Sequence, residues 1–453
     1  MDEPQFKFVS ERPDSKEFYS LHRKLLKIIY QWPGQNPLFR KVFLCLSTMM
    51  TTAALTGVLL KLEETDDMDL IVQCISITSA ISAGLLNQFT ILYKKKSITE
   101  MNNLMFDDWD NICFRGEKKI FRKYGKYARF AAQFIVGYAI FTAVAFVSVS
   151  IPTIVMNIVK PLNVSRDIPT IAEMEFGINQ ANHQIPFLIY IYISVWCTIS
   201  TLVCYDTSYT TYIIHNCALF EVTGYTFEYL LYNRNEETLN DYKEKKRTLG
   251  AIWQRAVNFH HKAFQFNDLV EETFTYPCAI ELILCTLQSS LCMMHVIYSL
   301  DKKEYHETFR YAVFVGSQFI RLFINILPGQ MLMDSSNNFY TSVYNGDWHF
   351  LPLNYQKMIV IVLAKASKTS YVTASKLFIL GFEIFTVVRD SLLLLCLIDL
   401  VSSAFLHFYC IHNDVYFSVG EDSCLLLHDS FVTKQSKVVK FENFDKFLNR
   451  NTY

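Results

Sequence analysis

The hydrophobic positions along the chain are gathered into apolar blocks of roughly 20 residues, with charged stretches between them. At a rise of about 1.5 Å per residue, a helix of roughly 20 apolar residues is long enough to cross the hydrocarbon core of a bilayer. The blocks therefore predict seven membrane-spanning helices. They are Val42–Leu60, Leu70–Tyr93, Phe130–Val159, Phe187–His215, Phe274–Leu300, Tyr311–Leu327 and Leu377–Leu400.

Composition supports this interpretation, since 51% of the 453 residues are hydrophobic and 15% are aromatic. A soluble chain of this length would scatter its apolar residues at strand or helix period instead of collecting them in blocks. We expect an all-α integral membrane fold. The sequence contains no phosphate-binding loop, no Ser/His/Asp arrangement and no Cys/His metal spacing. We therefore expect no enzymatic activity, no catalytic residue, no cofactor, no metal and no nucleic-acid partner.

The distribution of Lys and Arg predicts the orientation. Basic residues are concentrated in the N-terminal segment and in the second, fourth and sixth connections, while the alternate connections contain few. By the positive-inside rule the N-terminus is cytoplasmic and, with seven spans, the C-terminus is extracellular. The one N-x-S/T sequon, at Asn163, lies in a connection predicted to be outside, which makes Asn163 the candidate glycosylation site. The chain is expected to be a multi-pass plasma-membrane glycoprotein surrounded by membrane lipid.

Two features stand out among the more polar positions. Apolar residues between Tyr242 and Phe274 recur at helical spacing, which favours a helix that packs against other helices. The sixth apolar block carries a cation, Arg321, which we expect to face protein, water or the inner membrane interface instead of lipid.

The segment from Gly329 to Leu400 resembles the C-terminal signature of the insect odorant receptor family. The matching residues are Gly329, Asp334, Ser335, Tyr344, Asp347, Trp348, Leu351, Pro352, Ala364, Lys368, Thr373, Ala374, Lys376, Phe378, Leu380, Glu383, Phe385, Thr386 and Ser391. A weaker patch, similar to the family's fifth helix, comprises Glu272, Phe274, Glu281, Ser290 and Cys292. The family generally ends close to the seventh helix, whereas this chain continues to Tyr453.

The resemblance implies the ligand-specific subunit of an odorant-gated, non-selective cation channel. Such a subunit assembles with the family's shared co-receptor into a heterotetramer in the dendrite of an olfactory neuron. On this basis residues 1–328 form a six-helix membrane region with a ligand pocket in its outer half, and residues 329–376 form a cytoplasmic anchor segment. Residues 377–402 then form a pore-lining seventh helix, and residues 403–453 an atypical extracellular tail.

The last predicted helix has one face with a helical repeat at i, i+3, i+4, i+7 and i+11, where a ring of side chains from four subunits could close a pore by dewetting. The resemblance places the constriction at Ile398. The residues of this face are Ser391, Leu394, Leu395, Ile398 and Ser402. Ordinary helix packing is the alternative explanation of the same pattern.

The ligand site is predicted from the resemblance alone, as a cavity among the outer halves of the second, third, fourth and sixth helices. Aromatic and aliphatic walls with a few hydroxyl groups suit a small, volatile and hydrophobic ligand. Taken singly, each of these residues is more typical of helix packing than of ligand contact. The candidates are Ile75, Thr78, Ser79, Phe141, Val144, Ser148, Tyr190, Ser194, Tyr311, Phe314 and Gln318.

Two other functions remain open. A gustatory-type ligand-gated channel would share the topology, although its characteristic last-helix pattern is absent. A seven-helix receptor that signals through G proteins would place the N-terminus outside the cell, opposite to the orientation that the basic residues predict.

Overall fold

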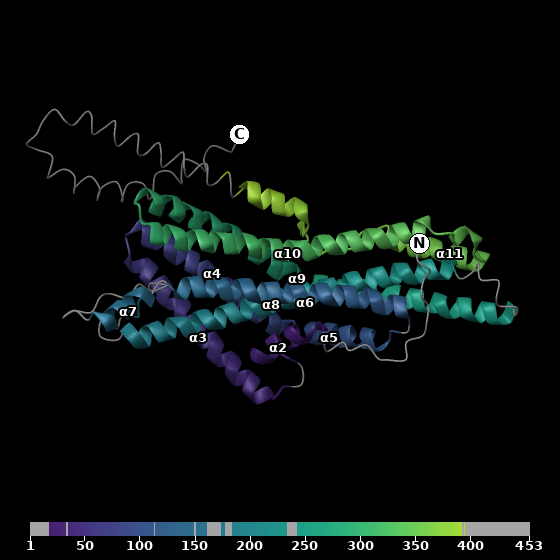
Figure 1. Cartoon of the computed structure of the whole chain (residues 1–453), viewed down its shortest axis with the longest axis horizontal. Helices are drawn as coiled ribbons and strands as arrows, with labels where there is room; N and C mark the ends of the chain where they lie inside the picture. The colour runs from purple at the N-terminus through teal and green to yellow at the C-terminus, as the bar shows by residue number, and fades with distance from the viewer. Residues whose placement is uncertain are drawn as a thin grey trace, which may run out of the picture. The chain divides into compact units, whose positions relative to one another are not determined.

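The computed structural model describes residues 18–32, 35–112, 114–148, 151–160, 174–176, 184–232, 242–391 and 394. These residues are almost entirely helical (Figure 1). The helices are α2 (Ser20–Ile28), α3 (Pro37–Glu64), α4 (Met68–Tyr93), α5 (Lys95–Asp110), α6 (Arg115–Val147), α7 (Ile151–Val159), α8 (Gln184–Tyr232), α9 (Tyr242–Asp301), α10 (Tyr305–Asn345), the 3₁₀ turn η2 (Trp348–Phe350) and α11 (Leu353–Ala366). A single antiparallel hairpin follows, formed by β1 (Thr373–Ala374) and β2 (Phe378–Ile379).

Six of the predicted spans are confirmed as helices that are long and apolar enough to cross a membrane. Within the described residues these are α3, α4, α6, α8, α9 and α10. The third span is shorter than predicted. The sequence predicted one helix over Phe130–Val159, but α6 ends at Val147 and a separate short helix, α7, begins at Ile151. Pro152 stands at the second position of α7, where its missing N–H costs nothing, while inside one long helix it would have broken a hydrogen bond.

Three helices are much longer than a membrane is thick. With 49, 60 and 41 residues, α8, α9 and α10 extend for roughly 60 to 90 Å, against about 30 Å of hydrocarbon. Each helix therefore continues beyond its apolar part into a polar part. The four long helices α6, α8, α9 and α10 lie lengthwise alongside one another, and α8 packs against the other three (Figure 1).

This continuation defines two halves of the bundle. The apolar half contains α3, α4, the C-terminal parts of α6 and α9, and the N-terminal parts of α8 and α10. Its outward-facing side chains are large and hydrophobic, such as Phe134, Trp196 and Ile283, as expected for contact with lipid. The polar half contains α2, α5, α11, the hairpin and the remaining parts of the long helices.

The largest hydrophobic core lies in the polar half and is built around α8. Every residue from 203 to 220 of α8 is buried, including Tyr205, Tyr209, Tyr212 and Phe220. Neighbouring aromatic rings from α9 and α10 meet them edge-on or tilted, as Phe274 does with Tyr209 at a centroid distance of 5.3 Å. Because α8 is buried on all sides at the centre of the polar half, the long helices can pack against it there without lipid.

The hairpin changes the prediction for the last apolar block. The sequence predicted a helix from Leu377, but Phe378 and Ile379 form β2, and the helix begins only at residue 382. Ser375 and Lys376 occupy the turn with positive φ angles of 56° and 59°, and the N–H of Leu377 donates to the carbonyl of Ala374 at 3.1 Å. This is the backbone of a type I′ hairpin turn, which local helix propensity does not reveal.

Tertiary contacts hold the hairpin in place. The N–H of Ser375 donates to the carbonyl of Thr275 at 3.0 Å, and the N–H of Thr373 donates to Glu271 at 2.8 Å, so both bonds tie the hairpin to α9. On the α10 side, a Cβ at Gly329 would lie only 2.2 Å from the carbonyl oxygen of Leu380. Glycine is therefore required at position 329 for this close approach.

Candidate functional site

A cavity of about 190 Å³ lies in the apolar half, enclosed mainly by α4, α6, α8, α9 and α10. Its surface is largely apolar, with a few side chains that can form hydrogen bonds. The lining residues are Ala54, Gln73, Ser76, Ile77, Ala80, Ile81, Tyr138, Ala139, Thr142, Met174, Ser194, Val195, Thr198, Ile199, Leu202, Val203, Gln288, Cys292, Arg310, Tyr311, Phe314, Ser317, Gln318 and Arg321. Concave apolar walls with few polar groups are typical of sites for small organic ligands.

Four of the predicted ligand residues line this cavity. They are Ser194 on α8 and Tyr311, Phe314 and Gln318 on α10. The three α10 residues recur at helical spacing and so share one face of that helix. The ring of Tyr311 also contacts His295 of α9, with the centroids 3.9 Å apart and the ring planes tilted by 52°.

The predicted residues on α4 lie beside the cavity but do not line it. The lining face of α4 carries Ser76, Ile77 and Ala80, while Thr78 and Ile75 point elsewhere and the hydroxyl of Ser79 donates to the carbonyl of Ser76 at 2.7 Å. Small polar residues such as Ser76, Thr78 and Ser82 occur on several faces of α4, so its sequence contains no clear amphipathic pattern from which the cavity face could be identified.

The predicted residues on α6 lie on its outer face. Phe141 is 65% exposed, Val144 and Ser148 are exposed as well, and the cavity is lined instead by Tyr138 and Thr142. The predicted Tyr190 on α8 also lies outside the lining. Its hydroxyl donates to the carbonyl of Met50 on α3 at 3.1 Å.

Sequence analysis missed Arg310 and Arg321 as cavity residues. The α10 stripe of Tyr311, Phe314 and Gln318 continues one turn further to Arg321, so extending the helical repeat would have identified that residue. Arg321 faces protein, as its place in an apolar block required.

Arg321 is the centre of a buried ionic cluster. Its Nε donates to Oδ2 of Asp206 on α8 at 3.1 Å, and its Nη2 donates to Oε1 of Glu281 on α9. The same Glu281 oxygen accepts from Nδ2 of Asn87 on α4 at 2.6 Å. The cluster joins four helices at one end of the cavity, and its paired charges are the arrangement that a low-dielectric interior tolerates.

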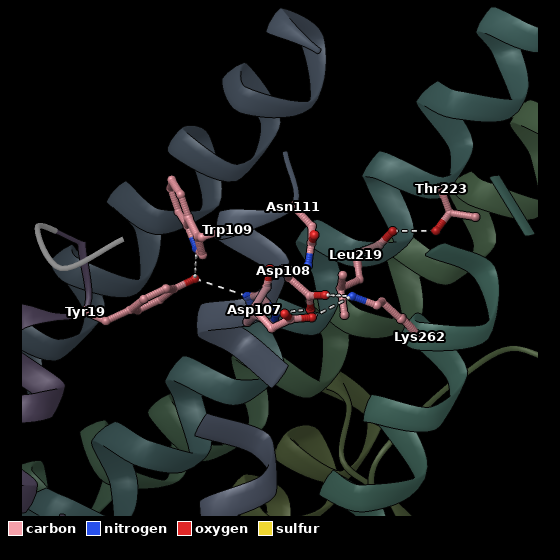
Figure 2. Close-up of polar contacts among 9 residues, drawn as sticks. Tyr19, Asp107, Asp108, Trp109, Asn111, Leu219, Thr223 and Lys262 are labelled. Carbon is pink, nitrogen blue, oxygen red and sulfur yellow. Dashed lines mark hydrogen bonds and ion pairs between the residues drawn. The ribbon is translucent and has the colours of Figure 1, made fainter. Parts of the chain in front are cut away.

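A second buried polar network lies in the polar half, where it joins α2, α5, α8 and α9. The indole N–H of Trp109 donates to the hydroxyl of Tyr19 at 3.3 Å, and that hydroxyl lies 3.2 Å from Nδ1 of His215. Nε2 of His215 lies 3.2 Å from Asp108, which also accepts from Nζ of Lys262 at 2.6 Å. Figure 2 shows the hydroxyl of Tyr19 next to the indole of Trp109, and Lys262 of α9 pointing toward Asp107 and Asp108 of α5 from the other side.

The hydrogen bonds of this network converge on His215 and Asp108. Trp109 donates to the hydroxyl of Tyr19, and the two ring nitrogens of His215 lie within hydrogen-bond distance of that hydroxyl and of Asp108, with their donor and acceptor roles set by the tautomer. Burial by itself would raise the pKa of Asp108, but the hydrogen bonds and charges of His215 and Lys262 outweigh it and hold the pKa below 3.8. The network therefore connects α2, α5, α8 and α9 through hydrogen bonds that converge on an ionised Asp108.

The predicted pore and glycosylation residues fall mainly outside the described part of the chain. Leu395, Ile398, Ser402 and Asn163 lie outside it. Ser391 is exposed in the helix that begins at residue 382, and its hydroxyl donates to the carbonyl of Val387 at 2.8 Å. Leu394 is helical. Within the described residues, no group of three His, Cys, Asp or Glu side chains could hold a metal ion.

Comparisons with known sequences agree on the family. The sequence model described as "7tm Odorant receptor" matches residues 67–391. Among curated Drosophila melanogaster proteins, the chain is 23% identical to Odorant receptor 85b over 161 residues and 20% identical to Odorant receptor 85c over 160 residues. Each of these alignments covers 35% of this chain and 39% of the relative, so the chain is matched to less than half of either protein.

The fold is that of solved insect olfactory receptors. The structure of olfactory receptor OR5 from Machilis hrabei in complex with eugenol superposes with a TM-score of 0.70 at 13% identity, covering 85% of this chain and 98% of that one. The OR5 structure described without eugenol superposes with a TM-score of 0.68 and covers 84% of this chain and 97% of that one.

Proposed function

This chain belongs to the 7tm odorant receptor family, and we propose that it is the ligand-specific subunit of an odorant-gated, non-selective cation channel. It is a multi-pass membrane protein with a predominantly helical fold. The proposal places its N-terminus in the cytoplasm, because the basic residues are concentrated in the polar half and in the N-terminal segment.

The observation that carries the proposal is the enclosed apolar cavity between α4, α6, α8, α9 and α10. An odorant is a small and mostly apolar molecule, and it gains affinity by leaving water for such a cavity. Cavity residues come from six helices, α3 included through Ala54, so an occupied cavity changes the packing of the whole apolar half.

Helix α10 connects this cavity to the start of the last helix. Phe314 and Gln318 of α10 line the cavity, and Gly329, three turns further along the same helix, contacts Leu380 after the hairpin. The side chain of the next residue, Gln330, accepts from the N–H of Phe382 at 3.2 Å and so caps the last helix. We propose that a ligand which binds more tightly to one position of α10 shifts the last helix, and that the Ser391–Ser402 face of that helix lines the pore.

The segment 329–376 is proposed as the contact with a shared co-receptor in a heterotetramer. Several large apolar side chains of this segment are exposed, among them Tyr344, Leu353, Val360 and Ile361. An exposed apolar face on the polar half requires a protein partner, because this half has no lipid to cover it.

Recording currents from cells that express the chain with and without an odorant co-receptor tests the proposal. Small volatile ligands, with eugenol as the first compound because the Machilis OR5 structure contains it, should evoke a cation current only when both subunits are present. Ile398→Ala should alter basal current or ion selectivity. A response that requires a second messenger, or an N-terminal tag accessible on intact cells, would overturn the channel and its orientation.

A further inference from the structure

We infer that Arg321 is the specificity-determining hydrogen-bond donor of the cavity, and that it selects a small, neutral ligand with a carbonyl-type oxygen. The inference rests on the proposed function only in taking the cavity as the ligand site. It starts from the position of Arg321 at the last turn of the α10 face that lines the cavity.

The guanidinium of Arg321 has more N–H groups than its two carboxylate partners use. Among the residues that the structure describes, Arg321 bonds to Asp206 through Nε and to Glu281 through Nη2. Its Nη1 therefore keeps two N–H groups for an acceptor in the cavity. Because the two carboxylates fix the guanidinium plane, a ligand does not have to order a flexible side chain when it binds.

The net charge of the cluster favours a neutral ligand. Asp206 and Glu281 do not line the cavity, whereas Arg321 does, so Arg321 is the member of the cluster that a ligand meets. With both carboxylates ionised the cluster carries a net charge of −1, and with one protonated it is neutral. In neither state does it attract an anion into a dry cavity, so a neutral acceptor is preferred to a carboxylate.

Arg310, the other cationic residue of the cavity, is held less firmly than Arg321. Arg310 forms an ion pair with Glu307 at 2.5 Å and donates to the hydroxyl of Tyr311 at 3.1 Å. Among the described residues, both its partners lie on its own helix within one turn, so no other helix holds its position. Arg321, in contrast, is held from α8 and α9, which gives a hydrogen bond to a ligand a fixed direction.

The volume of the cavity limits the size of the ligand. The cavity volume of about 190 Å³ is below the roughly 300 Å³ at which pockets for drug-sized ligands begin. The ligand class is therefore a compact ketone, aldehyde or ester whose oxygen reaches Arg321 and whose hydrocarbon part contacts Phe314 and Tyr138.

Isothermal titration calorimetry on the purified full chain in detergent tests this assignment. The probes are cyclohexanone, methylenecyclohexane, which has the same shape without the oxygen, and cyclohexanecarboxylate. Their affinities are compared between the wild type and a variant that removes all three charges together: Asp206→Asn, Glu281→Gln and Arg321→Met. The quantity to compare between proteins is the ratio of the affinity for the ketone to the affinity for the alkene, because this ratio cancels the different solubilities of the two probes.

The preference for ketone over alkene should fall by about ten-fold or more in the triple variant, as expected for loss of a hydrogen bond to a charged donor. Arg310→Met tests the competing assignment to the other cationic residue of the cavity. The control that should leave the ratio unchanged is the double substitution Glu117→Gln and Arg255→Met, which removes an ion pair in the polar half. An unchanged ratio in a folded triple variant, or loss of the ratio in Arg310→Met instead, would overturn the assignment.

The wild type alone provides a second test if the triple variant does not fold. Cyclohexanone should bind more tightly than cyclohexanecarboxylate, and any tighter binding of the carboxylate, or an absence of ketone binding, overturns the inference. The readout is binding and not current. A chain that ranks the probes as expected but passes no odorant-evoked current would refute the channel proposal and leave this inference intact.

Discussion

Nε2 of His215 on α8 lies 3.2 Å from Oδ2 of Asp108 on α5, and both side chains are completely buried. Lys262 of α9 reaches the other oxygen of the same carboxylate at 2.6 Å. Three helices that are far apart in the chain therefore meet at a single ionised group. This carboxylate is the central connection of the polar half.

Asp108→Asn should destabilise the protein by about 3 kcal/mol, because it leaves Lys262 without its buried counter-charge and opposes an amide to His215. A fall of several degrees in the melting temperature of the detergent-solubilised chain would show this. Asp107→Asn is the control. Asp107 also contacts Lys262, at 3.3 Å, but its side chain is 59% exposed and its loss should cost less than about 1 kcal/mol.

We expect the protein to lose stability in mild acid because His22 is buried. Burial lowers the pKa of its imidazole from 6.5 to about 4, with a hydrogen bond to Asn102 opposing the shift. Between these two values the unfolded chain binds the proton and the folded chain does not. The stabilisation is therefore complete above pH 6.5 and is lost as the pH falls toward 4, by roughly 3 kcal/mol in total.

Unfolding experiments between pH 7 and 4 on the wild type and on His22→Gln measure this contribution. The wild type should lose more stability than the variant across that interval, because glutamine does not titrate. Asp108, and His260, whose pKa burial also lowers to about 4, are present in both proteins, so their contributions cancel in the comparison. Parallel pH profiles for the two proteins would contradict the assignment to His22.

Gly329→Ala should weaken both the hairpin and odorant gating. The added Cβ would lie 2.2 Å from the carbonyl oxygen of Leu380, so either α10 or the segment after β2 must move. We expect a lower melting temperature and a reduced or absent odorant-evoked current.

Gly316→Ala is the matched control on the same helix, because a Cβ there meets nothing within 4 Å. Alanine in an open helical position should leave stability unchanged or raise it by up to about 1 kcal/mol. Equal effects of the two substitutions would show that the contact between Gly329 and Leu380 has no role.

Phe314→Ala should raise the odorant concentration for half-maximal current by about ten-fold, because the ring lines the cavity and its loss removes apolar contact with the ligand. Phe141→Ala should leave that concentration unchanged, since Phe141 is 65% exposed on the outer face of α6. Dose–response curves for the two variants, normalised to surface expression, compare them directly. A larger shift for Phe141 than for Phe314 would argue against this cavity as the ligand site.

The sequence by itself determined the class of this protein and most of its membrane crossings. Blocks of apolar residues are long enough to identify α3, α4, α8, α9 and α10 individually, because length and mean hydropathy do not depend on which way a helix is rotated. It also determined that Arg321 must face protein, water or the inner membrane interface, since an unpaired cation in lipid is too costly, and the structure shows that it faces protein.

Only the tertiary structure decided which faces of α4 and α6 line the cavity. A helix in lipid is apolar on its outer face and on its cavity face alike, so Phe141 and Tyr138 could not be distinguished by pattern alone. The same holds for the hairpin at Phe378 and for the bonds among Tyr19, His215 and Asp108. These depend on backbone and side-chain contacts between segments more than a hundred residues apart, which no local pattern encodes.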